Sequence, residues 1–169
     1  MIDDKKIIVA LDYNNNGELF KFVDKIDPDC CRLKIGKEIF TKYGPKVISE
    51  LHSKGFEVFL DLKFHDIPTT VYKACISALS HNIWMLNIHL SGGIDMVIAA
   101  MNAKNDCQSN TKLIGVTVLT SLSDDDCMRI YGCTRLDQIQ RLKGIGLDAN
   151  IDGFVCSPYD IDTLKSDNK

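Results

Sequence analysis

Six short apolar runs, rich in β-branched residues, recur along the chain and constrain its fold more than any other feature. They are Ile7–Leu11, Cys31–Ile35, Phe56–Leu62, Trp84–Leu90, Leu113–Leu119 and Ile151–Cys156. Their apolar character is nearly continuous rather than alternating, which is typical of parallel strands covered on both faces. Helically spaced residues follow most of the runs. The chain is therefore predicted to be α/β with a parallel sheet, either doubly wound or closed as a barrel.

The predicted helices carry apolar stripes at helical spacing. The stripes are Leu19, Phe20, Val23 and Ile26; Val47, Ile48 and Leu51; Val71, Cys75, Ala78 and Leu79; and Ile94, Val97, Ile98 and Met101. Pro45 suits the first position of a helix, where its missing N–H costs nothing. Ser123, which is followed by three aspartates, predicts a capped helix start.

One motif would favour the doubly wound alternative. Gly144-Ile145-Gly146-Leu147-Asp148-Ala149 matches the dinucleotide-binding pattern G-x-G-x-x-A. It precedes a predicted strand instead of joining a strand to the helix that follows, so its backbone amides would not surround a phosphate. We therefore interpret the match as accidental.

Charge and cysteine content exclude several classes of protein. Twenty Lys and Arg against 23 Asp and Glu give a net charge of −3, which offers nucleic acid no polybasic surface. We find no signal peptide and no apolar run near the roughly 18 residues that span a bilayer. The seven cysteines lack C-x-x-C spacing, as is typical of reduced thiols. We expect a soluble, cytoplasmic protein with no metal site.

The densest group of charges is Asp61-Leu62-Lys63-Phe64-His65-Asp66, at the end of the third predicted strand. Alternation along a strand places Asp61 and Lys63 on one face, while the neighbouring leucines pack under helices. The same reasoning turns Lys34 inward on the second strand, and Asp12 ends the first. Inward charges are costly unless they neutralise one another, so we expect an Asp/Lys array that presents a lysine as proton donor. A purely structural salt-bridge cluster is the alternative.

Five segments together resemble the orotidine 5′-phosphate decarboxylase family. They are Val9-Ala10-Leu11-Asp12, Leu33-Lys34-Ile35-Gly36, Asp61-Leu62-Lys63-Phe64-His65-Asp66-Ile67-Pro68, His89-Leu90-Ser91-Gly92-Gly93 and Val116-Thr117-Val118-Leu119-Thr120-Ser121, and Val155-Cys156-Ser157 resembles the family's sixth strand. The resemblance covers nearly the whole chain, and D-x-K-x-x-D followed by I-P is a specific element. It implies a TIM (β/α)8 barrel and a cofactor-free decarboxylation of orotidine 5′-phosphate to uridine 5′-phosphate in de novo pyrimidine biosynthesis.

The resemblance implies a role for each member of the array. Lys63 would donate the proton to C6 of the pyrimidine as carbon dioxide leaves. Asp61 would face the substrate carboxylate and hold Lys63 in place. Lys34 would complete the charge array and, like Asp12, contact the ribose.

The resemblance also implies a homodimer with composite active sites. In this family Asp66 reaches into the active site of the partner subunit, with Ile67 and Thr70 beside it. Thr120 corresponds to a position that contacts the substrate near its base. The family requires no metal.

Three features near the array receive no role from the resemblance. His65 and His89 are interpreted as structural residues. Ser91-Gly92-Gly93 is either an anion-binding turn or a tight connection between a strand and a helix, and the residues alone do not decide between the two.

The chain departs from the family's pattern after its sixth strand. The family binds the substrate phosphate with a Gly-Ile-Arg-Pro-like segment after the seventh strand and a Gly-Arg pair after the eighth, and this sequence has neither. Its βα units average roughly 28 residues, so eight would need about 225 residues, within the barrel range. We therefore expect residues 1–169 to form one incomplete, C-terminally truncated barrel domain that is inactive or impaired alone.

Two other functions stay open. In the first, the chain is a non-catalytic remnant that acts at most as a dimerising or ligand-binding module. In the second, it is one of the related magnesium-dependent sugar-phosphate decarboxylases and synthases, which share D-x-K-x-x-D. Those enzymes place a carboxylate near the end of the second strand, where this chain has Lys34, and this difference argues against them.

Overall fold

A parallel sheet of six strands forms the centre of the computed structural model, which describes residues 5–165. The strands are β1 (Ile8–Ala10), β2 (Arg32–Gly36), β3 (Val58–Phe64), β4 (Met85–His89), β5 (Lys112–Val116) and β6 (Gly153–Val155), and neighbours in the chain are neighbours in the sheet. Every pair is parallel. All six predicted strands are confirmed, although β5 ends at Val116 rather than Leu119.

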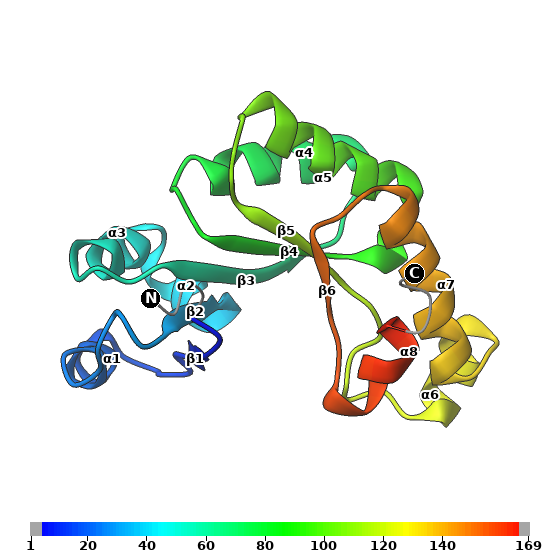
Figure 1. Cartoon of the computed structure of the whole chain (residues 1–169), viewed down its shortest axis with the longest axis horizontal. Coiled ribbons are helices and arrows are strands. Elements are labelled where there is room, and N and C mark those ends of the chain that lie inside the picture. Colours follow the sequence, from blue (N-terminus) through cyan, green and yellow to red (C-terminus); the bar gives the residue numbers. More distant parts are fainter. Residues whose placement is uncertain (1–4, 166–169) are drawn as a thin grey trace.

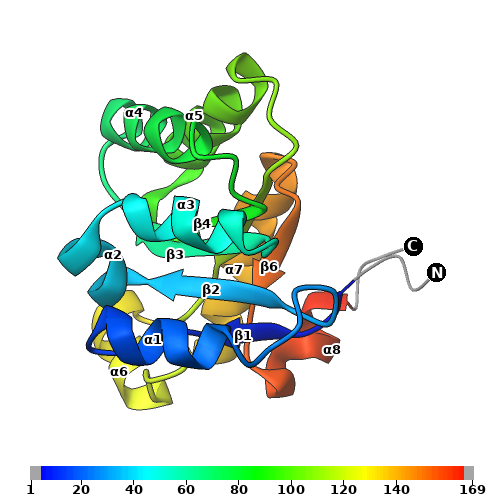
Figure 2. The same ribbon diagram turned by 90° about the vertical axis from the view of Figure 1, so that its left-hand side faces the viewer.

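Helices follow the strands and cover the outer face of the sheet (Figure 1). They are α1 (Asn16–Val23), α2 (Lys37–Tyr43), α3 (Lys46–Ser53), α4 (Pro68–Leu79), α5 (Ile94–Asp106), α6 (Asp124–Tyr131), α7 (Arg135–Asp148) and α8 (Ile161–Lys165), with short 3-10 turns at Leu90–Gly92 and Pro158–Asp160. Figure 2 shows α1 beside β1 and α3 beside β3. Within residues 5–165, no helix combines the length and the apolar character needed to cross a membrane.

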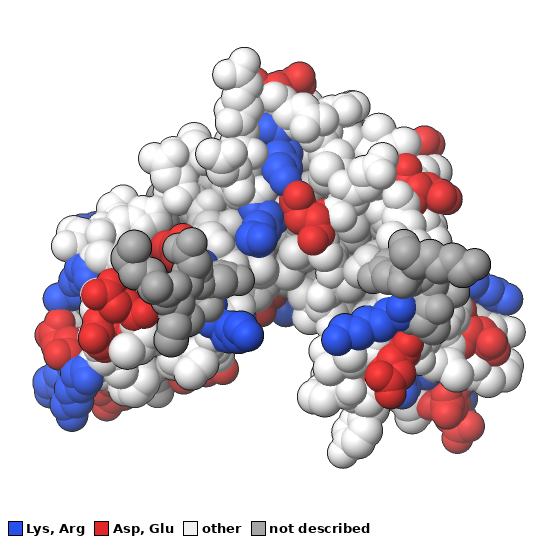
Figure 3. Space-filling model, in the orientation of Figure 1, with Lys and Arg blue, Asp and Glu red and all other residues white. Residues whose placement is uncertain are grey.

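The sheet curls like the wall of a barrel but stays open within the described residues. β1 and β6 are its edge strands, and each pairs there with a single neighbour. The two edges lie on opposite sides of an opening (Figure 1), and the molecular surface is deeply hollowed between them (Figure 3). A doubly wound sheet would reverse its strand order at a switch point, whereas here the order follows the chain throughout. The fold is therefore an incomplete TIM barrel.

The main core lies between the sheet and the helices. Leu33, Leu60 and Leu86, from three adjacent strands, are each 0% exposed. Leu60 and Leu62 line a small cavity together with side chains of α4, so the leucines that flank Asp61 pack under a helix as predicted. Full burial of one leucine side chain stabilises the fold by about 1.5–3 kcal/mol. This packing leaves the polar residues of β3 facing away from α4.

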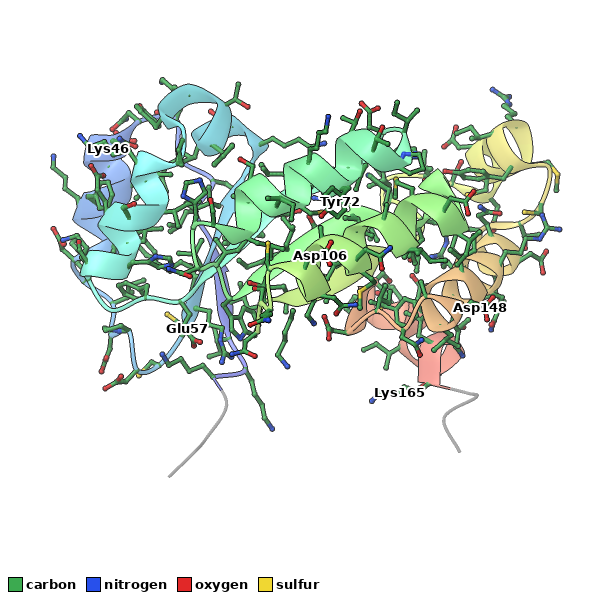
Figure 4. The ribbon with its side chains drawn as sticks, turned by 90° about the horizontal axis from the view of Figure 1, so that it is seen from above. Lys46, Glu57, Tyr72, Asp106, Asp148 and Lys165 are labelled. Atoms are coloured by element: carbon green, nitrogen blue, oxygen red, sulfur yellow. The ribbon has the colours of Figure 1, made fainter. Side chains whose placement is uncertain are left out.

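One predicted helical stripe is confirmed only in part. In α5, Val97 is buried and Met101 packs against the core as predicted, whereas Ile94 and Ile98 are exposed. The other buried residues of α5 are Met96, Ala100 and Ala103. α5 packs against both α4 and α7, and small alanine side chains let neighbouring helices approach closely. Between α4 and α5, the Tyr72 hydroxyl donates a hydrogen bond to Asp106 at 2.7 Å (Figure 4).

The local signals at helix ends are largely confirmed. Ser123 caps α6 in a reciprocal capping box with Asp126. Pro45 is the residue before α3 rather than its first residue. The Gly-x-Gly motif lies inside α7, where a Cβ on Gly146 would come within 2.6 Å of the Phe154 ring of β6. That glycine permits close packing of a helix on a strand, so the rejection of a phosphate loop is confirmed.

Candidate active site

The register of the first three strands brings four charged side chains together at the carboxyl ends of these strands. Ala10 of β1 pairs with Lys34 of β2, and Gly36 of β2 pairs with Asp61 of β3. Asp12 follows β1 within two residues. Because the strands are parallel, their carboxyl ends lie on the same side of the sheet, which is where barrels of this kind place their active sites.

The four side chains form an alternating chain of charges. Lys34 Nζ lies 3.6 Å from Asp12 Oδ1 and 3.5 Å from Asp61 Oδ2. Lys63 Nζ lies 2.6 Å from Asp61 Oδ1. The Asp12 side chain is 76% exposed, whereas that of Asp61 is only 12% exposed. The predicted Asp/Lys array is therefore present, and Asp61 is its centre because it contacts both lysines.

Asp61 is held in its ionised form. Burial by itself raises the pKa of this carboxyl, but hydrogen bonds from Lys63 and Asn87, together with the charges of Lys63 and Lys34, outweigh burial and lower its pKa. The carboxylate is thus a fixed acceptor for the Lys63 ammonium. A protonated amine held at a defined position is suited to donate a proton to a reacting atom.

The backbone of β3 is irregular where it carries these residues. Lys63 has a φ of +52°, in the left-handed region, and the pairing of β3 with β4 changes register between Leu60 and Phe64. Lys63 and Asp61 meet as predicted, but through a bulge rather than through regular alternation. Bulges commonly redirect side chains next to active sites.

Asn87 of β4 belongs to the same cluster and was not predicted from the sequence. It is 1% exposed, its Nδ2 donates to Asp61 Oδ1 at 2.6 Å, and its Oδ1 accepts from the Lys63 backbone N–H at 2.8 Å. A signal was available, since Asn87 is a lone amide within the apolar run Leu86-Asn87-Ile88. A buried amide is costly unless it is hydrogen-bonded, so such a residue calls for partners nearby.

The remaining predicted site residues lie in the segments that follow β3 and β5. Asp66 and Ile67 are in the exposed loop before α4, and Thr70 is exposed in the first turn of that helix. The Asp66 carboxylate accepts a hydrogen bond from the Ile67 N–H at 2.7 Å, and Ile67 is 64% exposed. Thr120 is exposed in the turn after β5. Their contacts with a substrate or a second subunit stay predictions.

His65 and His89 form a ring pair beside the array, with centroids 5.3 Å apart. Burial lowers the pKa of His89, and the charges of His65, Lys37 and Lys63 lower it further, while Asp61 opposes them. The turn that follows β4 is tight, because Gly93 has a φ of +86° and a Cβ on Gly92 would collide with the Met96 side chain and lie 3.1 Å from the His65 ring. These constraints account for both glycines without an anion, which favours the tight-turn interpretation.

The titration of His89 is expected to reveal this environment. Its folded-state pKa is lowered from 6.5, so protonation of His89 is less favourable in the folded than in the unfolded chain. The contribution of neutral His89 to the free energy of unfolding is therefore fully present above pH 6.5 and is lost as the pH falls through the folded-state pKa. The variant His65→Gln removes a neighbouring positive charge and is expected to raise the His89 pKa part of the way back. NMR titration of the ring protons measures both values. A His89 pKa of 6.5 or higher, or one that His65→Gln leaves unchanged, would contradict this account.

The donor groups of the site do not fit a divalent metal. Within residues 5–165, no group of three His, Cys, Asp or Glu side chains is arranged to hold a metal ion. Between Asp12 and Asp61, the Lys34 ammonium lies within 3.6 Å of both carboxylates and takes the position that a cation would need. This arrangement disfavours the magnesium-dependent alternative.

The seven cysteines are free thiols, and four of them are buried.

Comparison with known proteins gives a consistent result. The profile of the "Orotidine 5'-phosphate decarboxylase / HUMPS family" matches residues 5–168. Orotidine 5′-phosphate decarboxylase of Saccharophagus degradans is 46% identical over 166 residues, which cover 98% of this chain and 70% of the relative. The enzyme of that name from Aliivibrio fischeri is 48% identical over 166 residues, which cover 97% and 71%. The crystal structure of orotidine 5′-phosphate decarboxylase from Lactobacillus acidophilus matches with a TM-score of 0.86 at 34% identity, over 97% of this chain and 76% of that one.

Proposed function

This chain belongs to the orotidine 5′-phosphate decarboxylase family of carboxy-lyases, and we propose that its Asp12–Lys34–Asp61–Lys63 array converts orotidine 5′-phosphate to uridine 5′-phosphate. One observation carries the proposal. The Lys63 ammonium is held 2.6 Å from the half-buried carboxylate of Asp61 at the carboxyl ends of the strands of a curled parallel sheet. This is the geometry that a fixed proton donor needs.

The reaction makes a specific demand on the site. Cleavage of the bond between pyrimidine C6 and its carboxylate releases carbon dioxide and leaves the electron pair on C6, in the plane of the ring. The ring π-system cannot delocalise that pair. A fixed ammonium stabilises the developing negative charge and supplies the proton of the new C6–H bond. Lys63 performs both tasks, becomes a neutral amine, and recovers a proton from water.

The other members of the array support this step. Asp61 orients Lys63 and stands beside the substrate carboxylate, and the repulsion between the two negative charges is relieved as carbon dioxide leaves. Lys34 balances the charge of Asp61 from the opposite side, at 3.5 Å. Lys34 and Asp12 are assigned to the ribose hydroxyls, and the 76% exposed Asp12 side chain, which pairs with Lys34, is open to such a ligand.

The proposal includes a homodimer in which Asp66, Ile67 and Thr70 complete the active site of the other subunit. All three are exposed on the loop before α4 and its first turn. Ile67 is 64% exposed, and its burial by a second subunit would favour dimer formation because it removes apolar surface from water. Thr120, exposed after β5, is assigned to the substrate base.

The 169 residues by themselves are expected to show little or no turnover. The chain spans about 70% of the length of its Saccharophagus relative, and its sheet of six strands is open. In the family, the segments that bind the substrate phosphate follow the seventh and eighth strands. Binding energy from a remote phosphate lowers the barrier of the reacting centre, so its loss reduces catalysis and not only affinity.

The proposal is tested by reconstitution. The 169-residue polypeptide is mixed with a polypeptide that contains the remaining C-terminal part of the Saccharophagus relative, and release of labelled carbon dioxide from orotidine 5′-phosphate is measured. We expect turnover from the mixture, near-background release from either polypeptide alone, and no effect of EDTA. A stable assembly that binds uridine 5′-phosphate without releasing carbon dioxide would instead support the ligand-binding module. Loss of activity in EDTA would support the magnesium-dependent class.

A further inference from the structure

Asn87 lies where the irregular part of β3 faces β4. Leu60 pairs with Leu86 and Phe64 pairs with Ile88, so the segment between the two pairs is longer on β3 than on β4. Asn87 is the residue of β4 between them. It is 1% exposed, and both ends of its side-chain amide are used in hydrogen bonds within the cluster.

The first hydrogen bond supports the unusual backbone of Lys63. Residues other than glycine, asparagine and aspartate rarely adopt the left-handed region, and Lys63 does so with a φ of +52°. A bulge also leaves backbone groups without partners in the strand ladder. Asn87 Oδ1 takes the place of the missing partner, because it accepts from the Lys63 N–H at 2.8 Å.

The second hydrogen bond reaches the charged array. Asn87 Nδ2 donates to Asp61 Oδ1 at 2.6 Å, and this oxygen also accepts from Lys63 Nζ at 2.6 Å. One side chain therefore contacts the backbone of the proton donor and the carboxylate that orients it. Rotation of the amide would break both contacts, so the two partners are held in one mutual arrangement.

We propose that Asn87 is a positioning residue for the decarboxylation, and that it sets the location of the Lys63 ammonium by fixing the Lys63 backbone turn and the Asp61 carboxylate together. It acts through these two residues and touches no reacting atom. The catalytic consequence rests on the proposed function, whereas the positioning is a property of the free chain. A misplacement of about 1 Å in a reacting group can reduce a rate by about 100-fold.

The positioning is tested on the 169-residue chain without substrate. In Asn87→Ala we expect the Lys63 backbone amide to exchange its hydrogen about 10- to 100-fold faster than in the wild type, because it loses its acceptor. We also expect the Asp61 pKa, followed by carboxyl 13C NMR, to rise because one hydrogen bond to the carboxylate is lost.

Asn87→Asp separates the two hydrogen bonds. It keeps an acceptor for the Lys63 N–H, so we expect amide protection to be retained. It replaces the donor to Asp61 with a second carboxylate, so we expect the acid pair to take up a proton at higher pH than Asp61 alone. If Asn87→Ala does not fold, this nearly isosteric variant decides the question.

Thr111→Val is the matched control. Thr111 is 4% exposed and its hydroxyl donates to the Ile83 carbonyl at 2.6 Å, at the opposite end of the sheet. Thr111→Val removes this hydrogen bond and the one that the Ser109 hydroxyl donates to Thr111 Oγ1 at 2.9 Å, and it is expected to leave Lys63 exchange and Asp61 titration unchanged. The proposal is overturned if Asn87→Ala or, should that variant not fold, Asn87→Asp also leaves the Asp61 titration at its wild-type position.

A kinetic readout in the reconstituted assembly completes the test. Asn87→Ala is expected to lower kcat by about 10- to 100-fold with a much smaller change in KM, because the substrate contacts remain. An unchanged kcat beside faster Lys63 exchange would overturn the catalytic part of the inference. If the NMR changes occur but the wild-type assembly releases no carbon dioxide, the positioning stands and the proposed function fails.

Discussion

Replacement of Lys63 by alanine is expected to reduce carbon dioxide release by the reconstituted assembly by about 10⁴-fold or more. Lys63 combines two tasks that are usually distributed over several groups. A positioned general acid contributes about 10²- to 10⁴-fold, and one preorganised group that stabilises developing charge contributes about 10²- to 10³-fold. Single-turnover measurement with labelled substrate gives the rate of the chemical step directly.

Two further variants make that result specific. Lys63→Arg keeps a positive charge, but a guanidinium does not give up its proton readily, so we expect it to recover little activity. Lys46→Ala is the matched control, because the Lys46 side chain is 83% exposed on α3 and pairs only weakly with Glu50 at 3.6 Å (Figure 4). We expect wild-type turnover from Lys46→Ala. A Lys63→Ala enzyme within tenfold of the wild type would show that Lys63 is not the proton donor.

Replacement of Asp61 by alanine is expected to impair both catalysis and folding. Lys63 and Lys34 both lose their shared acceptor, at 2.6 and 3.5 Å, and Asn87 loses its partner. Because the Asp61 side chain is only 12% exposed, solvent replaces these contacts poorly. We expect turnover to fall by about 10²- to 10⁴-fold and the free energy of unfolding to fall by about 1–3 kcal/mol. Carbon dioxide release and urea denaturation measure the two effects.

The comparison with Asp61→Asn and a double variant separates charge from packing. Asp61→Asn keeps the shape and is expected to be more stable than Asp61→Ala but nearly as inactive. Asp61→Ala combined with Lys63→Ala is expected to be only slightly slower than Lys63→Ala alone, because residues that act as a unit are not additive. Fully additive losses would mean that Asp61 acts independently of Lys63.

The sequence predicted the frame of this site well. Near-continuous apolar runs identified every strand of the described sheet, and the spacing of Asp12, Lys34, Asp61 and Lys63 relative to those runs placed all four at one edge. Such predictions succeed because strand patterning depends on residues that are close together in the chain. Two of the four residues of the α5 stripe, Ile94 and Ile98, were wrong for the opposite reason, since the helices on either side of α5 select its buried face.

Which residues carry charge, and at which strand ends they lie, was thus determined by the sequence alone. The position of the Lys63 ammonium was decided only by the tertiary structure. It depends on a left-handed backbone turn that lysine does not favour and on the side chain of Asn87, 24 residues further along the chain, whose Oδ1 accepts a hydrogen bond from the Lys63 N–H. No local pattern encodes that turn, because its free-energy cost is offset only when β4 pairs beside β3 and brings Asn87 to the bulge.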